Sequence, residues 1–78
     1  MYNEQIDVLS YSGSKGDERP AALILRDLRI DVTEIIDHWI EEGFIDRVRK
    51  RYFIVKTSDG NIYRIYYDEN ALKWFYTS

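Results

Sequence analysis

Two glycines and a lysine lie close together in the stretch YSGSKGDERP, residues 11–20, which invites comparison with a phosphate-binding loop. Such a loop has the form G-x-x-x-x-G-K-[ST] between a strand and a helix, so that backbone amides face the anion. Here Gly13 and Gly16 are too close together, and Lys15 precedes the second glycine. Pro20 and the apolar alternation after it favour the start of a strand. We therefore expect a loop between two strands and no nucleotide site.

Side chains that could perform acid–base chemistry or bind a metal occur in the segment TEIIDHWIEEG, residues 33–43. His38 is the only histidine, and its acidic neighbour Asp37 is adjacent in sequence rather than across a pocket. On a helix, Glu34, Asp37 and Glu41 would share one face and could gather around a divalent cation, but such rows are more often a solvated face. No histidine, cysteine or glycine pattern completes a site. We therefore expect no enzyme activity, no metal and no cofactor.

Arginines alternate with aromatic residues around the Asp59-Gly60 pair, which is the strongest short signal for a β-hairpin. A two-residue loop at this pair predicts that odd positions before it and even positions after it share one side of the sheet. It places Phe53 opposite Tyr66 and Ile54 opposite Ile65. The predicted binding face consists of Arg49, Arg51, Phe53, Arg64 and Tyr66.

Guanidinium groups set among aromatic rings can stack on bases, hold phosphates or contact an acidic peptide, and arginine and tyrosine are frequent at interface hot spots. The alternative is that these arginines pair with the protein's own acids. The predicted register places Arg51 opposite Asp68, which would satisfy one of them.

Other strands are needed to support this hairpin. A first hairpin is predicted in AALILRDLRIDV, where a turn at Arg26 and Asp27 places Leu25 opposite Leu28 and Leu23 opposite Ile30. The segments IDVLSY, near the start, and LKWFYT, near the end, are two further strand candidates.

Residues 33–43 allow two interpretations. Val32, Ile35, Ile36, Trp39 and Ile40 follow helical spacing, and a glycine follows at the C-terminal end, which predicts a short helix. The competing interpretation is a bulged strand that continues from Ile30 and places Trp39 at a sheet edge.

The chain has 78 residues, no cysteine, 45% hydrophobic residues and a formal charge of −3. We expect a single domain over residues 1–78, because a chain this short buries one small core. The absence of cysteine suits a reducing cytoplasm. No signal peptide or long apolar run is present, so we expect no membrane partner. The predicted fold is mainly β, a small, strongly bent antiparallel sheet or SH3-like barrel of about five strands with one short helix. An α+β roll is the alternative.

The motif order of the chain resembles a family of small uncharacterised bacterial cytoplasmic proteins. In that family a YSG-K--ERP start, an EI-D-W centre and a Y-F-V---DG--Y-L--D----W end recur in this order. The centre matches Glu34, Ile35, Asp37 and Trp39, and the end matches Tyr52, Ile54, Asp59, Gly60, Tyr63, Asp68 and Trp74. The connection IEEGFIDRVRKR between the centre and the end is longer and more charged here. The second half also resembles a C-terminal module of actinobacterial proteins related to Y-family translesion polymerases.

These observations predict a non-enzymatic module that binds an unknown protein partner through its basic-aromatic face. The alternative is a module that binds single-stranded nucleic acid, which the second resemblance links to DNA repair or translesion synthesis. The acidic net charge weighs against the alternative, because nucleic-acid affinity depends on neutralising phosphates.

Overall fold

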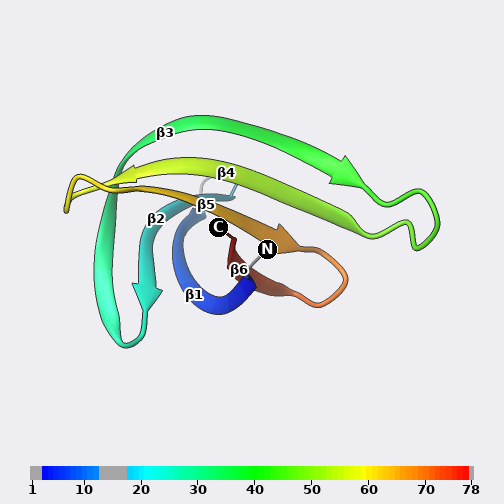
Figure 1. The fold of residues 1–78 in the computed structure, drawn as a ribbon, viewed down its shortest axis with the longest axis horizontal. Coiled ribbons are helices and arrows are strands. Elements are labelled where there is room, and N and C mark those ends of the chain that lie inside the picture. Colours follow the sequence, from blue (N-terminus) through cyan, green and yellow to red (C-terminus); the bar gives the residue numbers. More distant parts are fainter. Residues whose placement is uncertain (1–2, 13–17, 78) are drawn as a thin grey trace.

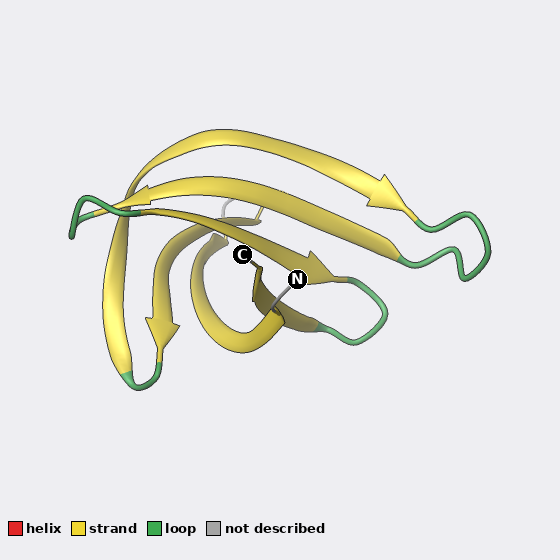
Figure 2. Ribbon diagram, in the orientation of Figure 1, coloured by secondary structure: helices red, strands yellow, loops and turns green. Residues whose placement is uncertain are grey.

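A computed structural model describes residues 3–12 and 18–77, and within them the chain forms six strands and no helix (Figures 1 and 2). The strands are β1 (Asn3–Ser12), β2 (Glu18–Leu25), β3 (Leu28–Glu42), β4 (Arg49–Thr57), β5 (Ile62–Asp68) and β6 (Lys73–Thr77). Each pairs antiparallel with its sequence neighbours, and β6 pairs with β1 to close a barrel. The mainly-β prediction is confirmed, and a small SH3-like barrel fits. The expected loop falls on residues 13–17, which include Gly13, Lys15 and Gly16 and lie outside the described residues.

The two longest strands, β1 and β3, each pair with one neighbour along one part of their length and with another neighbour along the rest. This division allows a short chain to close a barrel. In β3, residues 28–31 pair with β2 and residues 32–42 pair with β4. In β1, residues 7–12 pair with β2 and residues 3–6 pair with β6. The ends of β1 and β6 are thereby brought together, as the adjacent N and C labels show (Figure 1).

The first predicted hairpin is confirmed residue by residue. Leu23 lies opposite Ile30 and Leu25 opposite Leu28. The turn residues Arg26 and Asp27 both have positive φ, 51° and 67°. A two-residue loop with positive φ at both positions matches the right-handed twist of the flanking strands, even though neither residue is glycine.

Apolar side chains from β1, β2, β4 and β5 fill the barrel. The buried cluster is Ile6, Leu23, Phe53, Val55 and Ile65. Rings from β5 and β6 pack against it, including Tyr63, Trp74 and Tyr76. We call the side of the sheet that faces this cluster the inner face, and the opposite side the outer face.

The predicted helix over residues 33–43 is wrong, and the bulged-strand alternative is correct. The register of β3 against β4 shifts between Val32 and Glu34 and again between Ile35 and Asp37. Each shift inserts one extra residue, so the two-residue alternation of a strand is interrupted twice. Inward residues are then separated by three positions instead of two, which imitates the spacing of a helix in the sequence.

The second hairpin exists as predicted, but its register is wrong by one residue. Thr57 rather than Ser58 ends the ladder, since the Thr57 N–H donates to the Asn61 carbonyl at 3.0 Å. The loop therefore holds three residues, with Gly60 at φ 84°. Three-residue loops of this kind end in a left-handed residue that forms a bulge. Consequently Phe53 lies opposite Ile65, and Tyr52 lies opposite Tyr66.

The β3–β4 hairpin extends beyond the barrel and forms the projecting end of the molecule (Figure 1). Its turn is closed by the Gly43 N–H, which donates to the Val48 carbonyl at 3.0 Å, and by the Arg47 N–H, which donates to the Gly43 carbonyl at 3.1 Å. Arg47 supplies the left-handed residue, with φ 56°. The paired strands β3 and β4 continue up to this turn, so they determine where the turn lies. Among the described residues, no helix has the length and apolar character needed to span a bilayer.

Candidate binding surface

The one-residue change in register separates the five residues of the predicted binding face. Arg49, Arg51 and Phe53 share the inner side of β4, because Phe53 belongs to the core cluster and side chains alternate along a strand. Arg64 and Tyr66 point to the outer face, because Ile65 between them is in the core. The prediction that all five share one water-facing side is therefore wrong.

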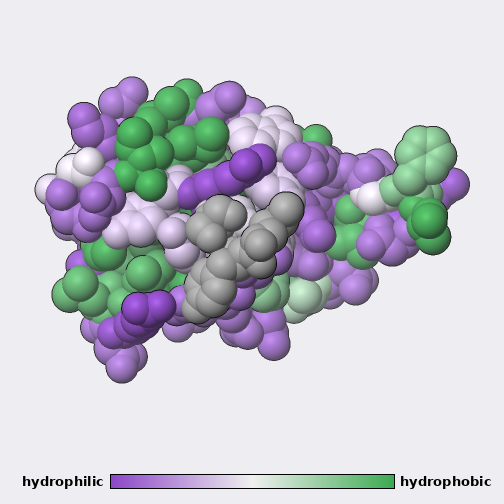
Figure 3. Space-filling model, in the orientation of Figure 1, coloured by the Kyte–Doolittle hydropathy of each residue, from purple (hydrophilic) through white to green (hydrophobic). Residues whose placement is uncertain are grey.

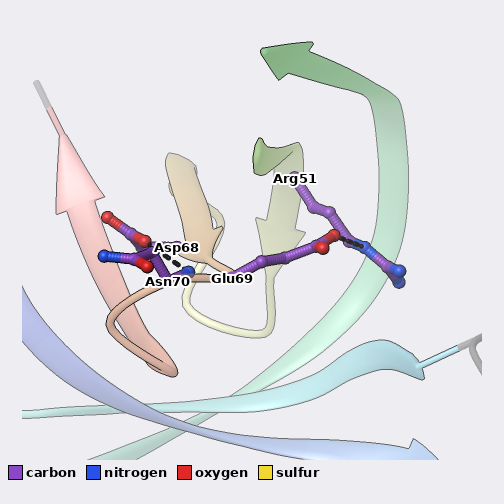
Figure 4. Close-up of polar contacts among 4 residues, drawn as sticks. All are labelled: Arg51, Asp68, Glu69 and Asn70. Atoms are coloured by element: carbon purple, nitrogen blue, oxygen red, sulfur yellow. Dashed lines mark hydrogen bonds and ion pairs between the residues drawn. The ribbon is translucent and has the colours of Figure 1, made fainter. Parts of the chain in front are cut away.

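Two of the three inner residues, Arg51 and Phe53, make structural contacts. Phe53 is 8% exposed, and its ring centroid lies 5.7 Å from that of Trp74. Arg51 forms an ion pair with Glu69, with 2.7 Å between Nε and Oε2 (Figure 4). The sequence suggested self-pairing of Arg51 with Asp68, but Asp68 instead accepts hydrogen bonds from the backbone N–H groups of Asn70 and Ala71 at 2.9 Å. Arg49, at the end of the strand, is exposed.

The outer face carries a continuous row of aromatic residues, one from each of four adjacent strands. This aromatic row consists of Trp39, Tyr52, Tyr66 and Phe75, and each member lies directly opposite the next. Consecutive ring centroids are 5.3, 5.0 and 5.1 Å apart. Directly opposed aromatic pairs stabilise a sheet by roughly 0.2 to 1 kcal/mol each. The row therefore joins β3, β4, β5 and β6 from outside the barrel.

Two cations flank the aromatic row. The Arg64 guanidinium carbon lies 5.3 Å from the Trp39 ring centroid and 5.7 Å from that of Tyr52. The Lys50 ammonium lies 5.4 Å from the Tyr66 centroid. These distances are within the range of cation–π attraction. The structure thus has a basic-aromatic outer face, but it shares only Arg64 and Tyr66 with the predicted set.

The rings of this face are largely used by one another. Trp39 and Tyr52 are stacked with an interplanar angle of 2°, so each covers one face of the other, and Arg64 lies over both rings. Tyr66 is only 7% exposed despite pointing outward. Burial, and then the nearby charge of Glu41, raise the pKa of the Tyr52 hydroxyl. A partner could therefore contact the edges of these rings and the side chains of Arg64 and Lys50, but not the stacked ring faces.

The outer face includes Trp39, Tyr52 and Phe75, which the predicted binding face lacked. A helical reading of residues 33–43 removed Trp39 from the sheet, and the two-residue loop placed Tyr52 opposite Tyr67 instead of Tyr66. The alternation of LKWFYT already separated Phe75 from Trp74 and Tyr76. A three-residue loop at Asp59-Gly60 would have aligned the row.

The most exposed apolar side chains among the described residues are at the turn between β3 and β4. Phe44 is 100% exposed and Ile45 is 97% exposed. We call these two residues the apolar tip. Apolar surface caps the projecting end of the molecule in Figure 3, with polar surface beside it. Arg47 and Arg49 follow on the β4 side.

The candidate acid–base and metal residues do not form a site within the described part of the chain. No group of three or more His, Asp and Glu side chains there has metal-binding geometry. Asp37 accepts a hydrogen bond from the backbone N–H of His38 at 2.8 Å, and Glu41 accepts one from Trp39 Nε1 at 2.9 Å. Glu34 lies across from Lys56 on the neighbouring strand. These acids thus line a strand and not a helical face.

Comparison with known proteins gives a family but no activity. No curated protein and no solved structure matches the sequence. A family model described as a domain of unknown function matches residues 1–76, nearly the whole chain. The chain therefore belongs to the family Domain of unknown function (DUF6504).

Proposed function

We propose that this chain is a non-enzymatic interaction module that binds a protein partner through the apolar tip and the adjoining outer face of the β3–β4 hairpin. The observation that carries the proposal is the nearly complete exposure of Phe44 and Ile45. Large apolar side chains that a small protein could have buried contribute about 1.5 to 3 kcal/mol each when they leave water. A partner with an apolar pocket would gain that contribution.

The hairpin also supplies what surrounds a typical hot spot. Arg47 and Arg49 stand beside the tip, and Lys50 and Arg64 lie along the outer face. Arginine and aromatic anchors surrounded by polar residues are typical of protein interfaces. The mixture of acids and bases suits a specific protein contact better than a polyanion.

The non-enzymatic part of the proposal is supported by the surroundings of His38. It is exposed, and its ring contact is with Phe53 at 6.2 Å between centroids. Its backbone, rather than its ring, is bonded to Asp37. A bacterial cytoplasmic setting is part of the same proposal and rests on the family resemblance and the absence of cysteine.

The test is affinity capture from bacterial lysate, followed by titration of the identified protein. The Phe44→Ser/Ile45→Ser double variant should weaken binding at least about tenfold, because hot-spot truncation costs on the order of 2 kcal/mol or more. Leu28→Ser is the matched control, since Leu28 is 64% exposed at a different hairpin turn. Both variants should keep the melting temperature of the wild type. Equal binding by the double variant would refute the role of the tip.

Single-stranded nucleic acid is the second candidate, favoured by the placement of Arg64 and Lys50 beside aromatic rings. The resemblance to a module of Y-family polymerase-related proteins supports it and would connect it with DNA repair. A labelled oligonucleotide should bind at low salt, weaken steeply as salt rises, and weaken with Arg64→Ala. Absence of binding at low salt eliminates this candidate. The mutual stacking of the rings is the reason we rank it second.

A further inference from the structure

One side of β3 is an open sheet edge beyond the barrel. Residues 28–31 are covered by β2, but residues 32–42 pair only with β4, and no strand among residues 3–12 and 18–77 pairs with the other side of residues 33–42. Exposed edges of this length present unpaired backbone groups to any extended chain. The edge is continuous with the hairpin that carries the apolar tip.

The hydrogen-bond pattern identifies which backbone groups face outward. Gly43 bonds to Val48, and Arg49 bonds to Glu69. Because pairs alternate along an antiparallel ladder, even-numbered residues of β4 bond to β3 and odd-numbered residues bond to β5. On β3, the backbone groups of Trp39 and Glu41 therefore point to β4. Those of His38, Ile40 and Glu42 point away from the sheet.

Part of this edge is protected by the protein itself, and part is open. The two bulges interrupt residues 32–37, and the Asp37 carboxylate takes the N–H of His38 at 2.8 Å. Bulges and charges of this kind are common devices against edge pairing. Ile40 and Glu42 lie on the C-terminal side of the two bulges and of Asp37. The side chain of Ile40 is itself 54% exposed.

The charges along the edge indicate the chemistry of an occupant. Residues 33–42 contain four acids, Glu34, Asp37, Glu41 and Glu42, and no lysine or arginine. The bases of this region are on β4, one strand spacing of about 4.8 Å farther from an added strand. Two copies of β3 would bring eight carboxylates together, so self-pairing is opposed by like charges. A strand carrying lysine or arginine would instead be attracted.

We propose that the β3 edge from His38 to Glu42 binds an extended basic peptide by β-strand addition. Main-chain bonds at Ile40 and Glu42 would supply affinity, and the acids would select lysine or arginine in alternation with apolar residues that pack beside Ile40. This inference rests on the proposed function, because its occupant is a protein segment. It uses the edge and not the apolar tip, so each can fail alone.

The probe is a short fluorescent peptide that alternates arginine with valine, and its control replaces every arginine with glutamate. Fluorescence polarisation measures both against the full chain. Ile40→Pro removes the outward N–H of residue 40. It removes no bond to β4, because that N–H points away from β4, and proline is tolerated at an edge position that faces solvent. Ile40→Ala is the matched control, since it keeps that N–H while losing the side chain. Circular dichroism verifies that both variants keep the sheet.

The arginine peptide should bind the wild type at least about tenfold more tightly than the glutamate peptide. Ile40→Pro should weaken it about tenfold. Ile40→Ala should weaken it by less, about threefold, because it loses the side-chain contact and keeps the N–H, and the tip double variant should leave it unchanged. Hydrogen exchange at the Ile40 and Glu42 amides should be fast in the free protein and slow with the peptide. Equal binding by Ile40→Pro, no binding by the arginine peptide, or amides already protected in the monomer would overturn the inference. If these amides become protected as the protein concentration rises and the protein dimerises, the edge binds a second copy of the chain, and the inference is overturned as well.

If peptide binding survives in the tip double variant while capture of the lysate partner is lost, the edge inference stands separately from the tip. If Ile40→Pro loses the peptide while capture of the partner persists through Phe44 and Ile45, the proposed function stands without strand addition to that partner. If the wild-type protein neither binds the arginine peptide nor captures a partner, the edge inference and the proposed function are both refuted.

Discussion

Replacing Phe53 with alanine should remove a large part of the stability of this barrel. The side chain is 8% exposed and belongs to the central cluster with Val55 and Ile65. Truncating a buried phenylalanine costs about 3 to 5 kcal/mol, which combines lost transfer energy with the cavity left behind. A chain of this size has a total stability of roughly 4 to 12 kcal/mol. Phe53→Ala should therefore lower the unfolding free energy by a quarter or more.

Urea denaturation followed by tryptophan fluorescence measures this directly, because the Trp74 ring lies 5.7 Å from Phe53. Ile54→Ala is the control. Ile54 is the next residue along β4, is half-buried and faces outward, so its truncation should cost about 1 kcal/mol. If Ile54→Ala destabilises the protein as much as Phe53→Ala, or if Phe53→Ala costs less than about 1 kcal/mol, the assigned register of β4 is refuted.

Two other predictions concern the loop and one partly buried hydroxyl. Gly60→Ala should cost about 1 to 2 kcal/mol in the same denaturation assay, because φ is 84° while an added Cβ would meet no atom within 4 Å; Gly60→Asn should cost less, since asparagine tolerates positive φ. The pKa of Tyr52 is raised by burial and by Glu41, so the unfolded phenol ionises first and the unfolding free energy should fall as the pH rises above about 10. Tyr52→Phe should show a smaller fall between pH 9 and 11, and an equal fall would refute the contribution of Tyr52.

Local turn chemistry and alternation predicted most of the strands. The first hairpin could be aligned from the sequence because a single apolar face left one register that buries Leu23 and Ile30. The first and last strands were also identified from alternation. Apolar alternation was therefore informative about the position of these strands.

The long strand β3 could not be identified with the same certainty, because two bulges alter its period. After the second bulge, Trp39 faces outward although it is apolar, and Ile40 faces inward although it is 54% exposed. Both belong to the part of the hairpin that leaves the barrel, where no core selects one side. Apolar residues there belong partly to the outer aromatic row and partly to the inner face. Their combined spacing in the sequence resembles that of a helix.

The candidate surface was more sensitive to error than the fold. A hairpin loop of two or three residues contains the same Asp59-Gly60 pair, but the extra residue moves every side chain opposite β4 by one position. Both sides of β4 and β5 carry aromatic residues, so hydrophobicity did not distinguish the two registers. The fold survived the error because the strands are the same, whereas the grouping of Arg49, Arg51 and Phe53 with Arg64 and Tyr66 did not.

The separation of charge in the sequence favours the observed register of β3 against β4. The acids at the end of β3 precede the bases at the start of β4, and the turn at residues 43–48 folds one group onto the other. Glu41 is thereby placed opposite Lys50, and Glu42 opposite Arg49. Directly opposed unlike charges favour this register, while a slip would weaken them. Within the described part of the chain no further strand lies beside residues 33–42 of β3, so the same arrangement leaves the acids at the edge, where the proposed basic peptide would meet them.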